Sequence, residues 1–183
     1  MNEEVEVKFT LENPDEVENK LNEIAKFVKA INQKDEYYVP KHEDFFVNVP
    51  ANKYFRIRHQ DGKSEVAYHF THYGDEGDRL KADEYETGVD DPIMMSKILK
   101  QLQFDNKITV TKHRKVYLYK TFEVVLDYIE ELGHYVEVEV KELQDSFQEE
   151  LIKCRKVIEE LGVKGEEVPE KGYPDLINEK KDL

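Results

Sequence analysis

Several segments of the chain alternate polar and apolar residues with a period of two. Residues 4–8 read Glu-Val-Glu-Val-Lys, and the same five residues recur at positions 137–141. Successive side chains of a β-strand point to opposite faces, so each segment places its valines on one face and its charges on the other. Strict alternation with β-branched valine favours a strand over a helix. Both segments are therefore predicted to be strands with one apolar and one charged face.

Further strands are predicted where the alternation continues or where a turn signal separates two runs. The dipeptide Asp61-Gly62 is the strongest such signal, because these residues accept the backbone of a two-residue hairpin. The predicted strands cover residues 3–9, 32–39, 53–60, 63–72, 79–87, 107–118, 120–129 and 134–142. Residues 40–52 are predicted to form a long loop, or a loop with a short strand around residues 45–49.

Three amphipathic helices are predicted between the strands. The first begins at Asn13-Pro14, with Asn13 as the N-cap and Pro14 at the first helical position. The second follows Asp91-Pro92 and covers residues 92–103. The third begins with a capping box of Ser146 and Glu149 and ends at Gly162. The apolar residues that share one face of the first helix are Val17, Leu21, Ile24, Ala25 and Val28.

The order of these elements predicts the fold class. Consecutive strands with hairpin signals outnumber alternating strand–helix units, which indicates an α+β protein with an antiparallel sheet. Closing that sheet into a barrel would remove its exposed edges. No domain boundary is visible, so residues 1–183 are expected to form a single domain. The polar tail after about residue 164 is expected to be partly disordered, with only residues 173–177 able to dock.

The amino-acid composition limits the kinds of molecule that the protein is expected to bind and the compartment in which it is expected to work. The 183 residues carry a net charge of −14, and 37% of them are charged. This charge argues against a broad surface for nucleic acid or for an anionic membrane. The one cysteine, Cys154, excludes an intramolecular disulfide and lies on the apolar stripe of the third helix, so we expect a core residue in a reducing compartment. No segment is long and apolar enough for a membrane span, and we expect a cytoplasmic protein.

The charged faces of the strands carry both signs of charge. Two basic pairs, Arg56 with Arg58 and Lys112 with Arg114, alternate along strands, as do two pairs of glutamates, at 84 and 86 and at 137 and 139. Guanidinium and ammonium groups bind phosphate oxygens, and carboxylates bind hard divalent cations. A triphosphate with its Mg²⁺ or Mn²⁺ needs both. The sequence physics leaves two alternatives open, a polar tunnel for such a ligand and solvated outer faces.

The order of these segments resembles that of a known family. Glu4-x-Glu6-x-Lys8 resembles the signature of the CYTH superfamily, the triphosphate tunnel metalloenzymes, and the later blocks resemble its class IV (CyaB-like) adenylyl cyclase branch. The resemblance runs from Glu4 to about Ile177. The later blocks are Gln33-x-Asp35-x-Tyr37, Phe55-Arg56-Ile57-Arg58, Val110-x-Lys112-x-Arg114, Val125-Leu126-Asp127, Leu132-Gly133-x-Tyr135-x-Glu137-x-Glu139 and Tyr173-Pro174-Asp175-Leu176.

The resemblance implies a fold and a site. The family fold is an eight-stranded antiparallel β-barrel, a tunnel with a charged interior and helices packed outside. Two divalent ions, Mg²⁺ or Mn²⁺, would be bound by Glu4, Glu6, Glu137 and Glu139, with Asp127 near them. The triphosphate would be bound by Lys8, Arg56, Arg58, Lys112 and Arg114, and catalysis would fall to Lys8, Lys112, Arg114 and Asp127. Many members are dimers, so the resemblance also allows a homodimer.

Two positions depart from the family pattern. His69 stands where the family usually has a lysine, and Ala82 stands where it often has an arginine before Glu84 and Glu86. A protonated His69 would still contact phosphate, with a charge that depends on pH near neutrality. Three functions remain open: an adenylyl cyclase that makes cyclic AMP and pyrophosphate, a triphosphatase acting on tripolyphosphate, thiamine triphosphate or a nucleotide, and a module that binds such a ligand without turnover.

Overall fold

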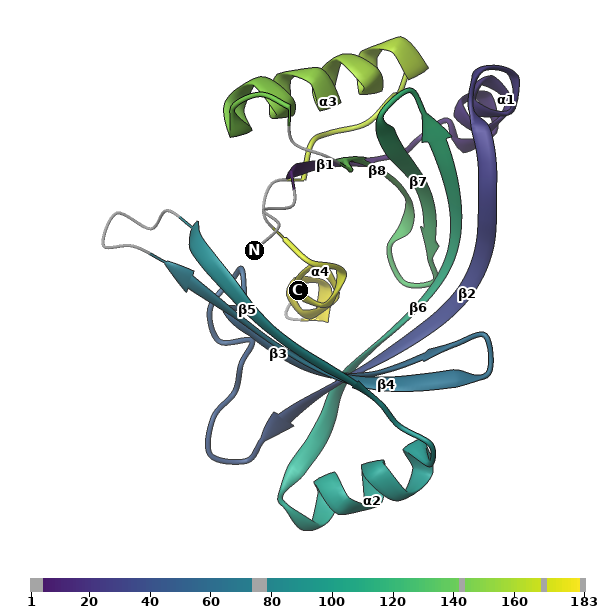
Figure 1. The fold of residues 1–183 in the computed structure, drawn as a ribbon. Helices are drawn as coiled ribbons and strands as arrows, with labels where there is room; N and C mark the ends of the chain where they lie inside the picture. The colour runs from purple at the N-terminus through teal and green to yellow at the C-terminus, as the bar shows by residue number, and fades with distance from the viewer. Residues whose placement is uncertain (1–4, 74–78, 142–143, 169–170, 182–183) are drawn as a thin grey trace. The chain divides into compact units, whose positions relative to one another are not determined.

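The computed structural model describes residues 5–73, 79–141, 144–168 and 171–181 (Figure 1). The described part of the chain contains strands β1 (Val5–Thr10), β2 (Lys26–Pro40), β3 (Lys53–Gln60), β4 (Lys63–Tyr73), β5 (Arg79–Gly88), β6 (Phe104–Tyr119), β7 (Phe122–Ile129) and β8 (Gly133–Val140). Its helices are α1 (Pro14–Ile24), α2 (Pro92–Gln101), α3 (Phe147–Leu161) and α4 (Tyr173–Lys181).

The eight strands belong to one antiparallel sheet in the order β1-β8-β7-β6-β2-β3-β4-β5. This confirms the predicted α+β class with an eight-stranded antiparallel sheet. Residue contacts cluster in two compact units, each of which is described by itself. Unit 1 contains residues 1–31 and 112–169, and unit 2 contains residues 32–111 and 170–183. Strands β2 and β6 contribute residues to both units.

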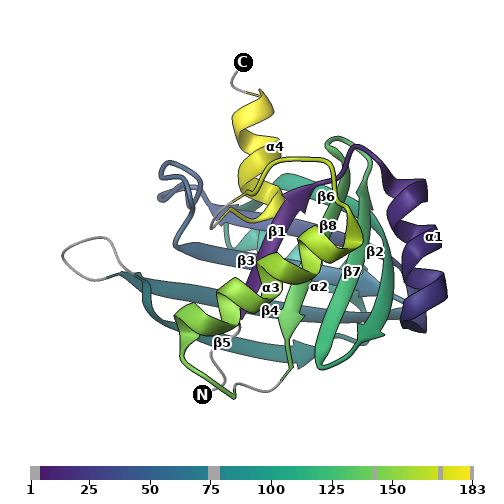
Figure 2. The ribbon, with the colours of Figure 1, turned by 90° about the horizontal axis from the view of Figure 1, so that it is seen from above.

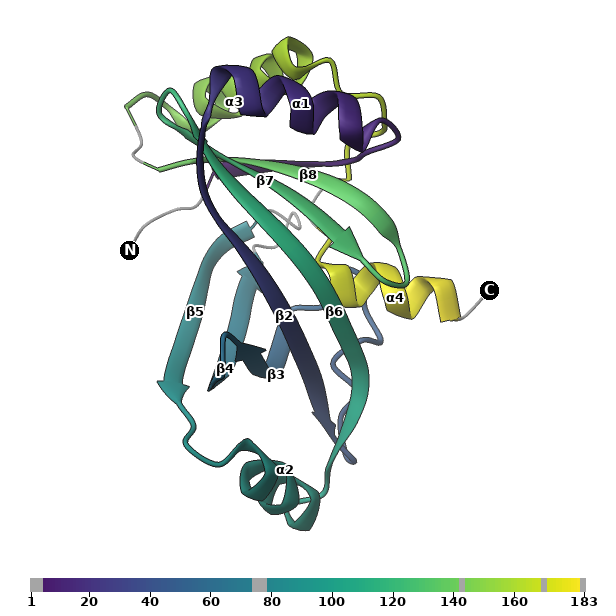
Figure 3. The same cartoon turned by 90° about the vertical axis from the view of Figure 1, so that its right-hand side faces the viewer.

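In unit 1, two helices cover the apolar face of the strands. Figures 2 and 3 show α3 running across β1 and β8, and α1 on the same side of the strands as α3. Val5 and Val7 of β1 are buried there, as the alternation predicted. Cys154 of α3 is fully buried in the same core, and burial raises the pKa of its thiol to about 11. A core role for this cysteine is thereby confirmed.

The segment after α3 pairs with the outer edge of β1. Thr10 donates its backbone N–H to the carbonyl of Glu166 at 2.9 Å, and Val168 donates to the carbonyl of Lys8 at 2.8 Å. These bonds satisfy edge groups of β1 that would otherwise need water or another chain. This part of the tail, which was predicted to be partly disordered, thus has backbone hydrogen bonds to β1.

In unit 2, α2 and α4 lie on opposite sides of β3, β4 and β5 (Figure 1). Leu99 of α2 packs on Ile57 of β3 and Tyr38 of β2 in a small apolar core. The other helix, α4, docks through Asp175, which is fully buried. Its carboxylate accepts hydrogen bonds from the Tyr54 hydroxyl at 2.5 Å and from the backbone N–H groups of Ala51 and Gly172 at 3.0 and 2.9 Å.

This docking corrects the prediction for the C-terminal tail. Residues 173–177 dock as expected, but they form the first part of the nine-residue helix α4 rather than an isolated contact in a disordered tail. The side chain of Asn178 reaches the carbonyl of Phe46 at 3.3 Å and extends the docking by a further turn. A helix this short is marginal alone, so its order depends on these tertiary contacts, which the local sequence does not reveal.

The first helix is shorter than predicted. It ends at Ile24, and Ala25 already has an extended backbone with φ −122° and ψ 161°. Val28 lies in β2, where the neighbouring Phe27 packs edge-on against Tyr117 at 5.4 Å between ring centroids. No glycine or proline marks the end of the helix. The residues after Ala25 form a strand instead, because β-branched and aromatic side chains fit a paired strand. Asn13 holds the N-cap position without a side-chain cap, because its Oδ1 accepts from the N–H of Lys164 instead.

The other local predictions mostly hold. Asp61 and Gly62 both have positive φ, the capping box of Ser146 and Glu149 forms, and Gly162 ends α3 in the left-handed region. The alternative of a short strand at residues 45–49 is wrong, because this segment forms turns and bends. Among the described residues, no helix has the length and apolar character that crossing a membrane requires.

We predict that Asp175→Ala weakens the docking of α4. The change leaves the donors of Tyr54, Ala51 and Gly172 without their acceptor, which should cost about 3 kcal/mol of unfolding free energy in a urea titration. Glu179→Ala is the matched control in the same helix, because its ion pair with Lys171 is partly exposed and should contribute less than about 1 kcal/mol. Equal losses for the two variants would contradict this account of the docking.

Candidate functional site

The strand register of unit 1 gathers charged residues on the face opposite the apolar core. Residues directly opposite each other in paired strands share a face, and Lys8 lies opposite Glu137, Glu6 opposite Glu139, and Arg114 opposite Asp127. We call this set the charged face of unit 1: Glu6, Lys8, Lys112, Arg114, Asp127, Glu137 and Glu139.

An ion-pair row crosses the four strands β1, β8, β7 and β6. Lys8 Nζ lies 3.3 Å from one oxygen of Glu137, and Arg114 Nη2 donates to the other oxygen at 2.7 Å. The same guanidinium binds Asp127 in a bidentate manner, with Nε and Nη2 donating at 2.8 and 2.5 Å. Bidentate pairs fix the plane of the guanidinium as well as its position. Arg114 is therefore held rigidly between two carboxylates.

Burial makes these charges sensitive to one another. Asp127 and Glu137 are 1% and 7% exposed. Burial alone would raise the pKa of Glu137, but the charges of Lys8, Arg114 and Lys112 outweigh burial and lower its pKa to about 2. Burial likewise opposes the charge of Lys8, yet Glu137 and Glu6 raise the pKa of that amine above its usual range. Both shifts keep Lys8 and Glu137 in their charged forms at neutral pH.

The remaining predicted residues of unit 1 lie on the same face. Lys112 is 6% exposed. Glu6 is exposed and Glu139 half-buried, and these two like charges are direct neighbours across β1 and β8. Like charges placed opposite each other in a sheet are destabilising unless a cation intervenes. Glu4, the first residue of the predicted metal set, lies outside the described residues.

The donor chemistry on this face suits a divalent metal ion only in part. Among the described residues, no group of three or more His, Cys, Asp or Glu side chains is placed to hold a metal ion. Mg²⁺ usually takes one or two protein carboxylates and completes its shell with water and substrate phosphates. The adjacent carboxylates of Glu6 and Glu139 fit that requirement, although Lys141 Nζ already lies 3.3 Å from Glu139. Asp127 and Glu137 fit it less well, since both are buried and bound by Arg114.

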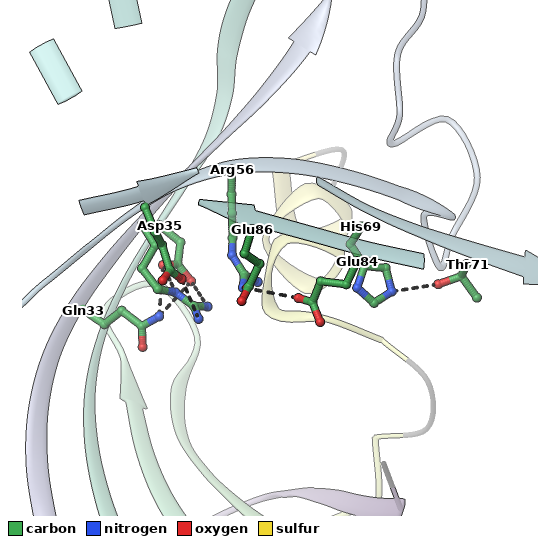
Figure 4. Close-up of polar contacts among 9 residues, drawn as sticks. Gln33, Asp35, Arg56, His69, Thr71, Glu84 and Glu86 are labelled. Carbon is green, nitrogen blue, oxygen red and sulfur yellow. Dashed lines mark hydrogen bonds and ion pairs between the residues drawn. The ribbon is translucent and has the colours of Figure 1, made fainter. Parts of the chain in front are cut away.

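Unit 2 repeats the bidentate arrangement on a second charged face. Arg58 of β3 donates from Nε and Nη2 to the two oxygens of Asp35 in β2, at 2.8 and 2.9 Å. Gln33 donates to the same carboxylate at 3.1 Å, and Asp35 is 1% exposed. The charged face of unit 2 comprises Asp35, Arg56, Arg58, Glu65, His69, Glu84 and Glu86, which the register places together. Figure 4 shows those of its side chains that it labels on one side of the strands.

Arg56 is less completely paired than Arg58. Its Nη2 lies 3.4 Å from Glu86 and 3.9 Å from Glu84, both on β5 (Figure 4). Its Nε is buried and lacks a hydrogen-bond partner among the described residues. A buried donor without an acceptor costs about 1–3 kcal/mol. The guanidinium therefore retains donor capacity that a ligand oxygen would satisfy.

His69, predicted to contact phosphate, lies on this face beside Thr71. Its Nε2 is 3.1 Å from the Thr71 hydroxyl, and its ring packs edge-on against Tyr54 at 6.1 Å between centroids. By register His69 is opposite Glu84, and Ala82 is opposite Thr71. The two departures from the family pattern, His69 and Ala82, thus lie on the paired strands β4 and β5. The side chain of Ala82 lies outside the described residues.

A cavity opens at the end of this face. It has a volume of about 600 Å³ and is lined by Arg58, Gln60, Asp61, Lys63, Ser64, Glu65, Glu86, Thr87 and Gly88. A second cavity of about 490 Å³ lies on the opposite side of the strands, between β2, β3 and α2. Only the first adjoins the predicted phosphate-binding residues.

The register brings together more of the site than the motifs predicted. Within unit 1 it places Lys8, Lys112, Arg114, Asp127, Glu137, Glu139 and Glu6 on one face, and within unit 2 it places Arg56, Arg58 and His69 on one face. Asp35 and Gln33 were named only in a resembling motif, and Glu84 and Glu86 only as a carboxylate pair; none was assigned to the metal or the phosphates. Their alternation along two strands was visible in the sequence, but only the register shows which arginine each side chain meets.

The low pKa of Glu137 predicts a pH-dependent effect on stability. An ordinary glutamate has a pKa of 4.5, so ionised Glu137 stabilises the folded chain above pH 4.5 and loses that contribution as the pH falls toward 2. We expect Glu137→Gln to lower the unfolding free energy at pH 7 by up to about 3 kcal/mol. Urea titrations should show this gap shrinking below pH 4.5, and a gap that is constant down to pH 3 would contradict the ion-pair row.

Comparison with known proteins agrees with this architecture. The CYTH domain family matches residues 2–173. A protein of Methanocaldococcus jannaschii named as a putative adenylate cyclase is 27% identical over 178 residues, which cover 94% of this chain and 97% of that protein. A protein of Pyrococcus horikoshii superposes with a TM-score of 0.73 and 28% identity, over 97% of this chain and 99% of its own.

A more distant structure has the same fold. It comes from Hippeastrum, with a TM-score of 0.69 and 16% identity over 99% of this chain and 97% of its own. The family match spans both units and includes every described strand that carries a charged side chain of the candidate site. The chain therefore belongs to the CYTH domain family.

Proposed function

We propose that the protein is a metal-dependent enzyme that acts on a nucleoside triphosphate and, as its main reaction, converts ATP to cyclic AMP and pyrophosphate. The observation that carries the proposal is the charged face of unit 1, where Lys8, Lys112 and Arg114 lie among carboxylates on the sheet face opposite the apolar core that α1 and α3 cover. Buried charges cost stability, so their concentration at one place favours a functional role.

The charged residues of the chain would act mainly by holding the triphosphate in place and by stabilising its negative charge. Lys8 and Arg114 are fixed by Glu137, so their charges are already oriented when a triphosphate binds and need little reorganisation. Lys112 adds a third cation on the same face. In unit 2, Arg56 and the Asp35-bound Arg58 offer further donors to phosphate oxygens. Glu6 and Glu139 would hold Mg²⁺ or Mn²⁺, which when bound neutralises charge on the phosphates.

The cyclase reaction breaks one bond and forms another. The 3′-hydroxyl oxygen of ATP attacks the α-phosphorus, the bond from that phosphorus to the bridging oxygen of the β-phosphate breaks, and pyrophosphate leaves with the electron pair. The proton of the 3′-hydroxyl passes to solvent water during the attack. Cations on either side of the reaction centre lower the barrier because negative charge shifts onto the leaving pyrophosphate.

A triphosphatase is the second candidate. It is favoured by the kind of groups on the charged faces, because guanidinium, ammonium and carboxylate groups are of the types that bind phosphates and metal ions rather than a base. The Hippeastrum protein is itself described as an adenylyl cyclase candidate with a dominant triphosphatase activity. Water would then attack the terminal phosphorus, and the same cations would stabilise the leaving diphosphate. Binding without turnover is the third outcome.

Product analysis separates these functions. We expect the protein, incubated with ATP and Mg²⁺ or Mn²⁺ between pH 7 and about 9, to release cyclic AMP and pyrophosphate in equal amounts, as resolved by ion-exchange chromatography. Orthophosphate from ATP and from tripolyphosphate, with no cyclic product, would replace the cyclase with the triphosphatase. Binding of either compound without any product would leave only the binding module.

The metal assignment is tested by Glu6→Gln combined with Glu139→Gln. Because these carboxylates are exposed and half-buried, the double variant should fold normally but lose at least roughly 100-fold in metal-dependent turnover. Glu23→Gln combined with Glu159→Gln is the control, since it removes two exposed carboxylates from α1 and α3. Turnover that is equal in both double variants would refute the role of Glu6 and Glu139.

A further inference from the structure

The cavity at the end of the charged face of unit 2 adjoins Arg58, one of the predicted phosphate-binding residues. It lies where the β3–β4 hairpin meets the end of β5, and three of its residues form a row across these strands, because Arg58 is opposite Glu65 and Glu65 is opposite Gly88. Arg58 thus belongs both to the charged face and to the wall of the cavity. A ligand whose phosphates reach Arg58 would project its remaining part into this space.

The lining of the cavity carries one more carboxylate than it has cations. Asp61, Glu65 and Glu86 supply three carboxylates, against the two cations of Arg58 and Lys63. This excess of negative charge disfavours a further anionic group beyond the one that Arg58 would bind. The carboxylates accept hydrogen bonds from sugar hydroxyls and from the amino group of a base. The volume of about 600 Å³ is in the range of pockets that bind small organic ligands.

Gly88 keeps one wall of the cavity open. A Cβ atom built on this residue meets no other atom within 4 Å, and its φ does not lie in the left-handed region. Neither backbone strain nor packing in unit 2 therefore requires glycine here. Position 88 is therefore a place where a side chain can be added to the cavity wall without disturbing the fold.

We propose that this cavity binds the nucleoside of the triphosphate and that Gly88 determines whether a substrate with an organic group is accepted. This inference rests on the proposed function, because it takes Arg58 as a phosphate ligand. It adds a subsite with its own chemistry: donor groups of a ribose and base enter the acceptor-rich cavity, while the phosphates stay with the arginines.

The test compares Gly88→Ala and Gly88→Leu with the wild-type chain. Calorimetric titrations with ATP and with tripolyphosphate, both with Mg²⁺, measure affinity without requiring turnover. We expect Gly88→Leu to weaken ATP at least about 10-fold, Gly88→Ala to have a smaller effect, and tripolyphosphate to change less than about 2-fold in either variant. Tyr85→Leu places a leucine on the other face of β5, where Tyr85 is 66% exposed, and should leave both affinities unchanged.

Three outcomes would overturn the inference. Equal weakening of ATP and tripolyphosphate by Gly88→Leu would mean that the cavity is not selective for the organic group. Unchanged ATP affinity in a variant with wild-type thermal unfolding would mean that the nucleoside binds elsewhere. In a third titration, with thiamine triphosphate and Mg²⁺, weakening by Gly88→Leu that leaves ATP unchanged would replace the nucleoside with another organic group. Failure of the wild-type chain to bind either ATP or tripolyphosphate would instead refute the proposed function, and that result is distinct from all three.

Discussion

The bidentate pairing of arginine with a buried aspartate is the interaction on which both charged faces depend. Arg114 with Asp127 in unit 1, and Arg58 with Asp35 in unit 2, each join two neighbouring strands. A carboxylate as buried as either of these would be costly without a partner. The pairs allow charges to remain inside each unit on a sheet face that is not used for the apolar core.

This constraint explains how the helices are distributed within each unit. The valines and leucines of β1, β7 and β8 need covering, and α1 and α3 cover them. In unit 2, α2 covers the apolar side, while α4 binds one end of the charged side through Asp175. The middle and the other end of that side stay available to a ligand, with Arg56 in the middle and the Gly88 cavity at the end. In each unit, the apolar face of the strands packs against helices and stabilises the fold, and the charged face carries the candidate site.

Sequence patterns predicted the faces of the strands better than the contacts between them. Alternation alone placed Val5 and Val7 in the core and Lys8 on the opposite face, because side-chain direction in a strand follows from local geometry. The partners of Lys8 and Arg114 depend on the pairing of strands far apart in the chain. Register of that kind is set by the whole sheet, so the motifs named the charges but not their pairs.

The wrong predictions have the same physical origin. Helix α1 ends at Ile24 because the following residues form β2, in which Phe27 packs against Tyr117. The order of α4 depends on Asp175 reaching a loop and a strand more than 100 residues earlier in the chain. Neither contact can be recognised from the sequence around the segment. Both outweigh the intrinsic secondary-structure preferences of these short segments.

The central claim is that the charged faces bind a triphosphate together with a divalent metal ion. The most direct test is a calorimetric titration of the wild-type chain with tripolyphosphate, in the presence of Mg²⁺ and in its absence, repeated at two salt concentrations. The account predicts saturable binding that is tighter with Mg²⁺ and weaker at high salt, because the contacts are ionic. The absence of binding under all these conditions, in a chain shown to be folded, would contradict it.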